Sequence, residues 1–428
     1  MTEKSTKPQL RFAGFDDTWE QRKLGDIMNV TSVKRIHQSD WTDSGIRFLR
    51  ARDIVSASKN EEPDDFLYIS KEKYDEYSLV SGKVAIGDLL VTGVGTIGVP
   101  YLIRNSEPLY FKDGNIIWFQ NSTKIDGDFF LYSFFGKAIQ DFINESAGIG
   151  TVGTYTIESG KKTPISLPEM REQQRIGVFF KQLDNLITLH QRKYDKLTNV
   201  KKSMLEKMFP KNGSNVPEIR FKGFSDAWEQ RKFDEVFDCT IPNNTLSRAE
   251  LNYESGSVRN IHYGDILIKY GSVVDVQNDE IPFATGKSSD DFKGALLQDG
   301  DIIIADTAED ETTGKACEIG NSQGLDVVSG LHTMVCRPRN KMALGYLGYY
   351  LNSDAYHHQL LPLMQGIKVL SLSRTNVQKT MVCYPKSKAE QQLIADCFRN
   401  LDNLITLHQR ELEKLKNLKK ACLEKMFV

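Results

Sequence analysis

The sequence lacks the features that mark secreted, membrane-spanning or zinc-binding proteins. Its six cysteines all lie in the second half of the 428 residues and form neither a CxxC pair nor a close cluster with histidine. A disulfide framework and a structural zinc site are therefore both disfavoured. The opening residues carry no apolar signal core, and no apolar stretch approaches the roughly 18 residues of a membrane span. We expect a cytoplasmic protein with no membrane contact, no metal and no bound cofactor.

Motifs for catalysis or nucleotide binding are scarce as well. Gly314-Lys315 is not a P-loop, because Glu309 stands where its first glycine belongs. There is no H-E-x-x-H, no G-x-S-x-G and no Asn/Asp-Pro-Pro-aromatic motif of amino-methyltransferases. Gly93–Gly98 fits G-x-G-x-x-G, but Val99–Ile103 after it predicts a strand rather than the helix of a dinucleotide site. A glycine-rich hairpin tip explains this loop better, and an enzyme that binds a nucleotide or S-adenosylmethionine there remains the alternative.

Net charge gives little sign of a partner. The chain carries 55 basic and 57 acidic residues, a net charge of −2, so binding to a polyanion would need positive charge gathered locally. Apolar residues make up 40% of the sequence, which is ample for packed cores. At roughly 150 residues per domain, the length favours about three domains over one compact core.

The sequence is a tandem repeat, and its ends match far better than its middles. Residues 172–209 and 390–427 share 25 identities in 38 positions, at an offset of 218. The openings, 8–23 and 217–232, also match, at an offset of 209. The middles share only a faint skeleton, such as Gly87-Asp88 with Gly300-Asp301, Asp53-Ile54 with Asp265-Ile266, and Gly148-Ile149 with Gly366-Ile367. Constant ends around divergent middles indicate one mode of assembly that carries two different readers.

The closing segments predict two long helices. From Glu172 to Met208 there is no proline, and apolar residues recur at spacings of four and three, the heptad pattern of a helix packed on a partner helix. The seam of the first copy is Ile176, Phe180, Leu183, Ile187, His190, Tyr194, Leu197, Lys201, Met204 and Met208, and that of the second is Ile394, Phe398, Leu401, Ile405, His408, Leu412, Leu415, Lys419, Cys422 and Met426. The two helices should pack on each other, with the polar seam residues fixing the register or reaching solvent.

Each middle mixes short strands with helices. Strands are expected at Asp88–Val91, Asn115–Phe119, Asp301–Ile304 and Thr333–Cys336, and helical patterns at Leu131–Phe142 and Leu344–Leu351. The middles are therefore two α+β domains.

With Trp-Glu-Gln-Arg-Lys in each opening, and Glu-Gln-Gln ahead of Leu-Asp-Asn-Leu-Ile-Thr-Leu-His-Gln-Arg in each closing segment, the sequence resembles the specificity subunits of type I restriction-modification systems. The resemblance implies an α+β fold in which two target recognition domains are separated by a pair of long antiparallel, coiled-coil-like helices. Each domain would read one half of a split, asymmetric site on double-stranded DNA. The helices would set the spacing and dock methyltransferase (modification) subunits, two per chain.

The same resemblance implies that this chain is not itself an enzyme. Adenine-N6 methylation would belong to the modification subunits, and ATP-driven translocation and cleavage to restriction subunits of the complex. The first target recognition domain would cover residues 1–171, the first long helix 172–210, the second domain 211–389 and the second helix 390–428. A scaffold of helices alone would not explain why the middles diverge.

The family has no residue signature for base reading, so candidates are chosen by chemistry, as donors, acceptors or positive charges on expected loops. They are Lys34, Arg35, Arg50, Arg52, Thr96 and Tyr155 in the first domain, and His262, Tyr263, Lys315, His332, Lys368 and Arg374 in the second. For each, a surface position without a role is an equally good explanation. Residues expected to pack the helices and subunits are Leu183, Ile187, Leu197, Leu401, Ile405 and Leu415. Trp19 and Trp228 are expected to be core or docking anchors.

Overall fold

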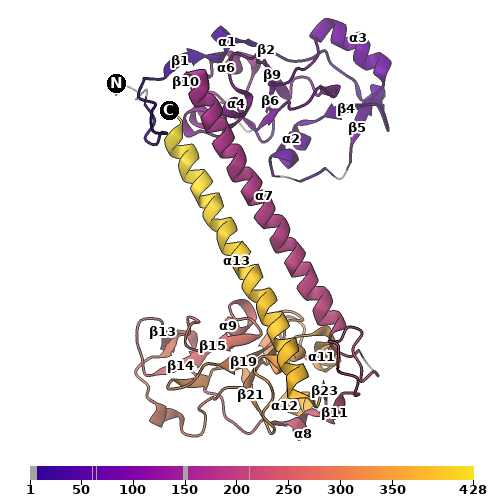
Figure 1. Cartoon of the computed structure of the whole chain (residues 1–428), viewed down its shortest axis with the longest axis vertical. Coiled ribbons are helices and arrows are strands. Elements are labelled where there is room, and N and C mark those ends of the chain that lie inside the picture. The colour runs from indigo at the N-terminus through magenta and orange to yellow at the C-terminus, as the bar shows by residue number, and fades with distance from the viewer. Residues whose placement is uncertain (1–6, 60, 64, 148–152, 212) are drawn as a thin grey trace. The chain divides into compact units, whose positions relative to one another are not determined.

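The computed structural model describes residues 7–59, 61–63, 65–147, 153–211 and 213–428. The chain divides into two compact units, the first made of residues 1–191 and 410–428 and the second of residues 192–409. Two long helices, α7 (Met170–Lys207) and α13 (Lys388–Met426), contribute to both units and appear in magenta and yellow in Figure 1. Each begins two residues before its predicted start, so the heptad pattern is confirmed as a signal for these helices.

The first unit is mixed α/β, as predicted. Its shorter helices are α1 (Leu24–Ile27), α2 (Ala51–Ser58), α3 (Lys71–Ser81), α4 (Gly127–Ser133), α5 (Lys137–Ser146) and α6 (Ile157–Lys162). Its strands are β1 (Glu20–Lys23), β2 (Asn29–Thr31), β3 (Trp41–Thr42), β4 (Ile46–Leu49), β5 (Leu67–Ile69), β6 (Leu89–Thr92), β7 (Pro100–Leu102), β8 (Leu109–Phe111), β9 (Ile116–Gln120) and β10 (Pro164–Leu167).

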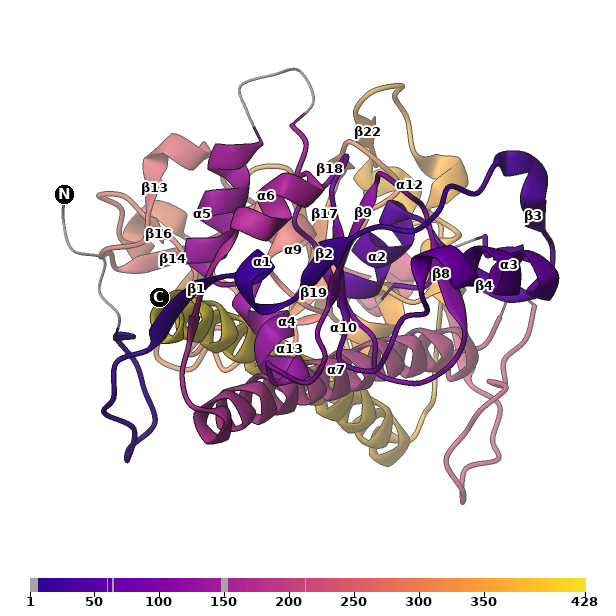
Figure 2. The same ribbon diagram turned by 90° about the horizontal axis from the view of Figure 1, so that it is seen from above.

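The strands of the first unit form two four-stranded sheets, β2-β9-β6-β7 and β3-β5-β4-β8, and a pair β1-β10. Only β4 and β8 run parallel among these described neighbours. The main core lies where the first sheet meets α4, α7 and the end of α13, and its Phe119, Phe129 and Phe180 side chains are fully buried. The short helices α1 and α6 lie side by side (Figure 2), and Leu24 and Ile27 of α1 belong to the same core.

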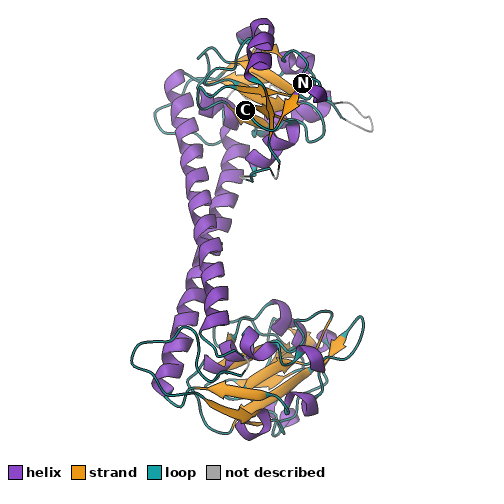
Figure 3. Ribbon diagram, turned by 90° about the vertical axis from the view of Figure 1, so that its right-hand side faces the viewer, coloured by secondary structure: helices purple, strands orange, loops and turns teal. Residues whose placement is uncertain are grey.

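The second unit contains the helices α8 (Phe233–Val236), α9 (Tyr263–Ile268), α10 (Tyr346–Leu351), α11 (Asp354–His357) and α12 (Arg374–Val377). Its strands are β11 (Glu229–Lys232), β12 (Phe237–Asp238), β13 (Leu251–Asn252), β14 (Val258–Ile261), β15 (Val273–Asp275), β16 (Phe283–Ala284), β17 (Ile302–Ala305), β18 (Thr307–Ala308), β19 (Ala316–Gly320), β20 (Asp326–Ser329), β21 (Thr333–Pro338), β22 (Leu370–Ser371) and β23 (Met381–Tyr384). In both units the strands gather into sheets that helices surround (Figure 3).

The two units repeat one topology. The order β12-β21-β17-β19 matches β2-β9-β6-β7, and β13-β16-β14-β20 matches β3-β5-β4-β8, including one parallel pair in each. The second unit adds β15 beside β19 and a short pair β18-β22. The faint skeleton shared by the middles is therefore a shared strand order.

The long helices pack on each other within each unit. In the first unit Lys419 Nζ lies 2.6 Å from Asp184 Oδ1, and the rings of Phe180 and Phe427 are 5.7 Å apart. In the second unit Lys201 Nζ lies 2.5 Å from an oxygen of Asp402. Because the start of α7 meets the end of α13 in one unit and the reverse holds in the other, the helices are antiparallel. All twenty predicted seam residues are buried or half-buried.

The remaining predicted elements hold with one exception. The four predicted strands are β6, β9, β17 and β21, and the helical pattern at 344–351 is α10. The single helical pattern at 131–142 is wrong, because the structure has two helices, α4 and α5, with a break at Gly136. A Cβ atom on Gly136 would lie 2.9 Å from Phe427 Cβ, so the chain turns there to pass the end of α13 closely.

Candidate nucleic-acid interface

One edge of the main sheet in the first unit is built from loops. The chain leaves β2 and β6 at this edge and enters β9 there, because β9 lies antiparallel between them. Gly93 N–H donates to the Asn115 carbonyl at 2.7 Å, and Tyr155 N–H donates to the Gly93 carbonyl at 2.9 Å. These bonds tie separate loops together. We call residues 32–37, 93–98, 113–115 and 153–156 the first loop edge.

The second unit has the same edge with different residues. Asp306 N–H donates to the His332 carbonyl at 3.1 Å, and Leu372 N–H donates to the Asp306 carbonyl at 2.8 Å. These bonds occupy the places of the two bonds made by Gly93 in the first unit. Residues 240–247, 306–315, 330–332 and 365–374 form the second loop edge. Eight of the twelve predicted DNA residues lie on the two loop edges, and the other four lie at the starts of the matching helices α2 and α9.

The first loop edge presents two exposed cations on a fixed backbone. Lys34 N–H donates to Ser81 Oγ at 2.7 Å and its carbonyl accepts from Tyr110 Oη at 2.8 Å, so the main chain is held from both sides. Its ammonium lies 4.0 Å from the centre of the Tyr77 ring. Arg35, with 69% of its side chain exposed, makes a long ion pair of 3.7 Å with Asp113. Both side chains are available to a phosphate or a base edge.

The arginines at the start of α2 are engaged with carboxylates. Arg50 forms ion pairs of 2.9 Å with both Asp53 and Asp65, and its side chain is only 14% exposed. Arg52 pairs with Asp65 at 2.5 Å but is 60% exposed. Hydrogen bonds from the two guanidiniums lower the pKa of Asp65 to about 2. Arg50 therefore orders the loop before β5, whereas Arg52 remains exposed enough to exchange its carboxylate for a phosphate.

Thr96 and Tyr155, the other two candidates of the first unit, differ in exposure. Thr96 is exposed at the turn between β6 and β7, and its carbonyl accepts from Thr92 Oγ1 at 2.5 Å. Tyr155 is only 2% exposed, and its hydroxyl lies 2.5 Å from Thr163 Oγ1 in the core. The prediction of Tyr155 as a base reader is therefore corrected, because its ring supports the loop edge from inside.

The second unit brings three predicted residues together. The rings of His262 and Tyr263 are 4.6 Å apart, and those of Tyr263 and His332 are 5.3 Å apart. His262 Nδ1 accepts from Gly264 N–H at 3.2 Å, and burial lowers the pKa of His262, so the neutral ring carries its proton on Nε2. His332 is half exposed and lies 3.5 Å from both Thr307 and Asp306. This cluster offers donors, acceptors and an aromatic face in one place.

The other three candidates of the second unit differ in their surroundings. Lys315 is half-buried, and its ammonium donates to the carbonyls of Leu267 and Tyr270 at 3.0 and 3.1 Å. Burial lowers the pKa of Lys315. It joins the end of α9 to the loop before β19, which leaves its ammonium less available to DNA than that of an exposed lysine. Lys368 is exposed and Arg374 is half-buried at the start of α12.

Sequence reasoning missed several residues of the second loop edge. Asn243 Nδ2 and Asn244 Nδ2 donate to the carbonyls of Gly330 and Ser329 at 3.2 and 2.8 Å. Ile367, next to Lys368, is fully exposed. The recurrence of Gly-Ile at 148–149 and 366–367 was the available signal for Ile367. Gly148 and Ile149 lie outside the described residues.

The residues proposed for helix and subunit packing lie on the seam. Leu183 is 5% exposed. Ile187, Leu197, Leu401, Ile405 and Leu415 are half-buried. Trp19 and Trp228 are 2% and 3% exposed, in the main cores of their units.

The G-x-G-x-x-G loop is a hairpin tip. It joins β6 to β7, which pair antiparallel from Leu89↔Leu102 to Val91↔Pro100, and no helix begins after it. Gly98 N–H donates to the Thr92 carbonyl at 2.7 Å, and Gly95 and Gly98 have φ of +78° and +75°. The alternative of a nucleotide-binding enzyme that uses this loop is therefore not supported.

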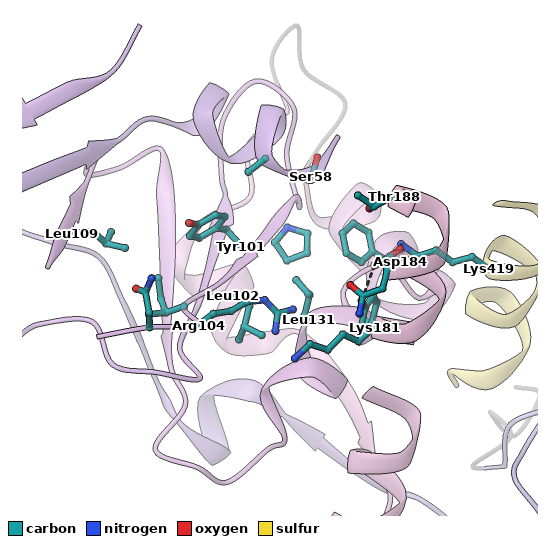
Figure 4. Close-up of a pocket in the computed structure, with 17 residues that line it drawn as sticks. Ser58, Tyr101, Leu102, Arg104, Leu109, Leu131, Lys181, Asp184, Thr188 and Lys419 are labelled. Atoms are coloured by element: carbon teal, nitrogen blue, oxygen red, sulfur yellow. Dashed lines mark hydrogen bonds and ion pairs between the residues drawn. The ribbon is translucent and has the colours of Figure 1, made fainter. Parts of the chain in front are cut away.

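A pocket of about 620 Å³ in the first unit lies between the outer strand β7 of the main sheet and the helix α7 (Figure 4). Leu102 and Arg104 at the end of β7 face Lys181 and Asp184 of α7 across it. Tyr132 Oη donates to Asp184 Oδ2 at 2.7 Å. None of the twelve predicted DNA residues lines this pocket, which belongs to the attachment of the domain to the long helices.

Two features are absent from the described part of the chain. No group of three or more His, Cys, Asp or Glu side chains is placed to hold a metal ion there. None of its helices is long and apolar enough to cross a membrane.

The sequence matches one protein family twice. Residues 16–199 and 225–417 each match the type I restriction modification DNA specificity domain. A putative type I restriction enzyme specificity subunit of Haemophilus influenzae is 34% identical over 170 residues, which cover 39% of this chain and 41% of that protein. The specificity subunit of the MjaVIII type I restriction enzyme of Methanocaldococcus jannaschii is 23% identical over 304 residues, 68% of this chain and 67% of that protein.

Two solved structures share the fold over almost the whole chain. The S subunit of a type I restriction-modification system from M. genitalium superposes with a TM-score of 0.54 at 14% identity, covering 99% of both chains. A chain from a study of assembly and conformational transition of the type I system gives a TM-score of 0.51 at 14% identity, covering 96% of this chain and 98% of that one. The predicted architecture of two α+β domains with paired long helices is thereby confirmed.

Proposed function

Because the chain belongs to the family of type I restriction-modification specificity subunits, we propose that its two domains each read one half of a split site on double-stranded DNA. The first target recognition domain covers residues 1–171 and the second residues 211–389. The chain itself performs no chemistry, and acts on DNA in the cytoplasm within a complex whose modification subunits methylate adenine N6. Restriction subunits join through that complex and use ATP.

One observation carries the proposal: equivalent loop edges on a repeated scaffold carry different chemistry. The edges are closed by matching backbone hydrogen bonds, Gly93 to Asn115 in the first unit and Asp306 to His332 in the second. The first edge presents Lys34 and Arg35, whereas the second presents His332, whose ring packs against Tyr263 at the start of α9. Base readout requires particular donors and acceptors at each base pair, so different side chains on one framework read different sequences.

Two repeated apolar patches on the long helices support the docking of two modification subunits. In the first unit Leu186 and Leu189 of α7 and Leu418 of α13 are 44%, 46% and 47% exposed. In the second unit the matching residues, at the offset of 218, are Leu404 and Leu407 of α13 and Val200 of α7, at 44%, 51% and 38%. We call these the first and second helix patches.

The members of each helix patch lie on the same side of the helix pair. Leu186 directly precedes the seam residue Ile187, and Leu418 directly precedes the seam residue Lys419. In an antiparallel pair, positions directly before a seam residue flank the seam on one common side. The ion pair between Asp184 and Lys419 places Leu186 and Leu418 at the same level. Two matching patches on one chain fit two copies of one partner.

The test of DNA reading is expression of the full chain with its modification subunit in a host that lacks such a system, followed by genome-wide mapping of methylated adenine. The expected result is one split sequence with two unlike halves. Replacing Lys34 and Arg35 by Ala should relax one half, and replacing Tyr263 and His332 by Ala the other. Lys386→Ala, an exposed lysine away from the second loop edge, should change neither. Methylation without any sequence preference would contradict the proposal.

The test of docking is the subunit count of the purified complex by native mass spectrometry. A variant with Leu404→Glu and Leu407→Glu should bind one modification subunit instead of two. Docking at the second helix patch would then bury two charges. Glu at both Leu186 and Leu189 should give the same loss. Glu at both Asn403 and Thr406, which are exposed on another face of α13, is the control and should keep two. A full complement in both leucine variants would disprove docking at the patches.

A further inference from the structure

We infer that the hairpin tip at Ile367 is an apolar wedge that inserts between base pairs of the DNA read by the second domain. The inference rests on the proposed DNA-reading function. Its starting point is exposure: Ile367 is 100% exposed and Val369 is 52% exposed, on either side of the exposed Lys368. An isolated exposed apolar residue needs no explanation by itself. The rigid backbone and the location of this tip, however, indicate a role for Ile367.

The tip is held in one conformation. Gln365 and Ser371 bond to each other in both directions, with N–H to carbonyl distances of 3.0 and 2.8 Å. The residue after Gln365 is Gly366, with a φ of +122°, and a Cβ atom there would overlap the Val369 carbonyl oxygen. Only glycine fits this turn. A tip whose backbone is fixed loses little conformational entropy when it is inserted.

The tip stands on the second loop edge. Its base strand β22 pairs with β18, with Thr307 opposite Ser371 (Figure 2). Thr307 in turn lies 3.5 Å from His332, whose ring contacts Tyr263. The wedge is thus connected by short steps to the cluster of donors and acceptors that we propose to read bases. A duplex seated on that cluster would pass the tip.

The size and charge of the tip favour DNA over a protein partner. Two exposed apolar side chains are far smaller than the roughly 800 Å² that each partner buries in a stable protein interface. They match the single Ile, Leu or Phe wedges that DNA-bending proteins push into a base step. Lys368 between them supplies the positive charge that a phosphate beside the step requires. Glu309, Asp310 and Glu311 on the turn after β18 are exposed, so the phosphate backbone should run on the Lys368 side.

A wedge at this place would unstack one base step and bend the duplex. Unstacking costs a few kcal/mol and is offset by the extra surface that bent DNA brings against the protein. Sequence preference at that step would then follow from how easily it unstacks, and pyrimidine–purine steps are the softest. The inference therefore adds a position that is read by deformation, without a hydrogen bond to a base.

The experiment uses the complete complex of this chain with its modification subunits, and a duplex that contains the site methylated by the wild type. 2-Aminopurine is placed at one position at a time, away from the methylated adenines and their neighbours, because base flipping by the methyltransferase also raises fluorescence. The complex with the wild-type chain should raise the 2-aminopurine fluorescence at one base step only. Ile367→Ala should abolish that rise and weaken binding by about tenfold, whereas Ile367→Leu should keep both. Ile268→Ala, which removes an isoleucine that is 87% exposed at the end of α9, should match the wild type.

Three outcomes would overturn the wedge. The first is a wild-type complex that raises the fluorescence at no step, and the second is a rise that persists in Ile367→Ala. The third is a loss of modification subunits from Ile367→Ala in the absence of DNA, which would make the tip a protein contact. If the wild-type complex methylates no specific sequence, the proposed function itself fails before the wedge is tested. The two failures are therefore distinguishable.

Discussion

The first and second units share backbone hydrogen bonds at both ends of their main sheets and differ in the side chains on their loop edges. Asp88 accepts from Ala85 N–H at 2.9 Å, and Asp301 accepts from Gln298 N–H at 2.9 Å in the same turn. Ile103 N–H and Ile319 N–H then donate to the carbonyls of Asp88 and Asp301 at 2.9 and 2.8 Å. The framework that carries each domain on the helices is thus one structure built twice.

The differences begin one side chain away from this framework. Asp88 is bonded by the Trp118 indole at 2.8 Å, whereas Asp301 is bonded by the Arg337 guanidinium at 2.7 Å. The buried Leu102 of β7 is replaced by the buried Glu318 of β19. The comparison teaches that assembly is fixed by backbone turns and a few repeated carboxylates, while the side chains around them are free to change.

The largest loss of stability should follow substitution of Glu172 or Glu390. Each of these side chains joins an opening segment to its long helix. Arg11 Nε pairs with Glu172 at 2.7 Å, and Arg220 Nε pairs with Glu390 at 2.7 Å, with both carboxylates almost fully buried. Glu172→Ala and Glu390→Ala should each cost about 3–5 kcal/mol, because a buried guanidinium is left unpaired. Glu390→Ala should cost more, because Trp228 Nε1 also donates to Glu390. Urea unfolding, with limited proteolysis to assign the unit, measures both. Equal losses below 1 kcal/mol would show that these pairs do not hold the openings.

Glu318 should make the stability of the second unit fall between pH 4.5 and 8, in a step that the first unit lacks. Burial raises the pKa of Glu318 to about 7 from 4.5, so the folded state keeps a proton that the unfolded state has lost. Its contribution to stability is complete below pH 4.5 and is lost as the pH rises through 7. Between pH 4.5 and 8 the wild type should lose up to about 3 kcal/mol of stability through this group, and Glu318→Gln should not show this loss.

Urea unfolding of the second unit in wild type and variant, at a series of pH values, checks the Glu318 prediction. The first unit, with Leu102 at the matching place, is the internal control and should show no such step. A wild-type second unit whose stability does not fall relative to Glu318→Gln as the pH rises from 4.5 to 8 would contradict it.

Removing one tyrosine–aspartate hydrogen bond should cost less stability, and the cost should be the same in both units. Tyr132 donates to Asp184 at 2.7 Å, and Tyr349 donates to Asp402 at 2.8 Å. Tyr132→Phe and Tyr349→Phe should each cost about 1.5–3 kcal/mol, the value of a hydrogen bond to a charged group. Thermal unfolding of each unit measures the pair. Costs that differ by more than about 1 kcal/mol between the two variants would mean that the repeated scaffold is not energetically symmetric.

The smallest effect should come from the lysines that interrupt the helix seam. Lys201 pairs with Asp402 and Lys419 with Asp184, and all four side chains are partly exposed. Lys201→Met and Lys419→Met should change stability by about 1 kcal/mol or less, because solvent screens such pairs. Circular dichroism melts at low and high salt check this. A loss above about 2 kcal/mol would show that these pairs do more than fix the register.

The repeated parts of this molecule were predictable from the sequence, and the loop edges were not. The heptad seam located α7 and α13 because helix packing leaves a periodic apolar signal. The core strands were visible as short apolar runs. The break at Gly136 was missed because its cause is Phe427, which lies almost 300 residues away in the sequence.

The candidate site was predictable only in part, for a physical reason. Residue type showed which side chains have donors or charge, but not whether the fold had already used them. Lys315 donates to two carbonyls and Tyr155 is buried, and both facts depend on tertiary contacts. Ile367 was missed because an apolar residue carries no donor, and only its full exposure marks it.

The central claim, that each divergent middle reads one half of the site, is tested most directly by giving one chain two copies of the same middle. Residues 24–163 replace residues 233–380, so both joins lie beside the matching strand pairs β1-β10 and β11-β23. The full chain is expressed with its modification subunit, and methylated adenines are mapped across the host genome. The account predicts a symmetric site made of the first half-site in both orientations. Retention of the original second half-site would contradict it.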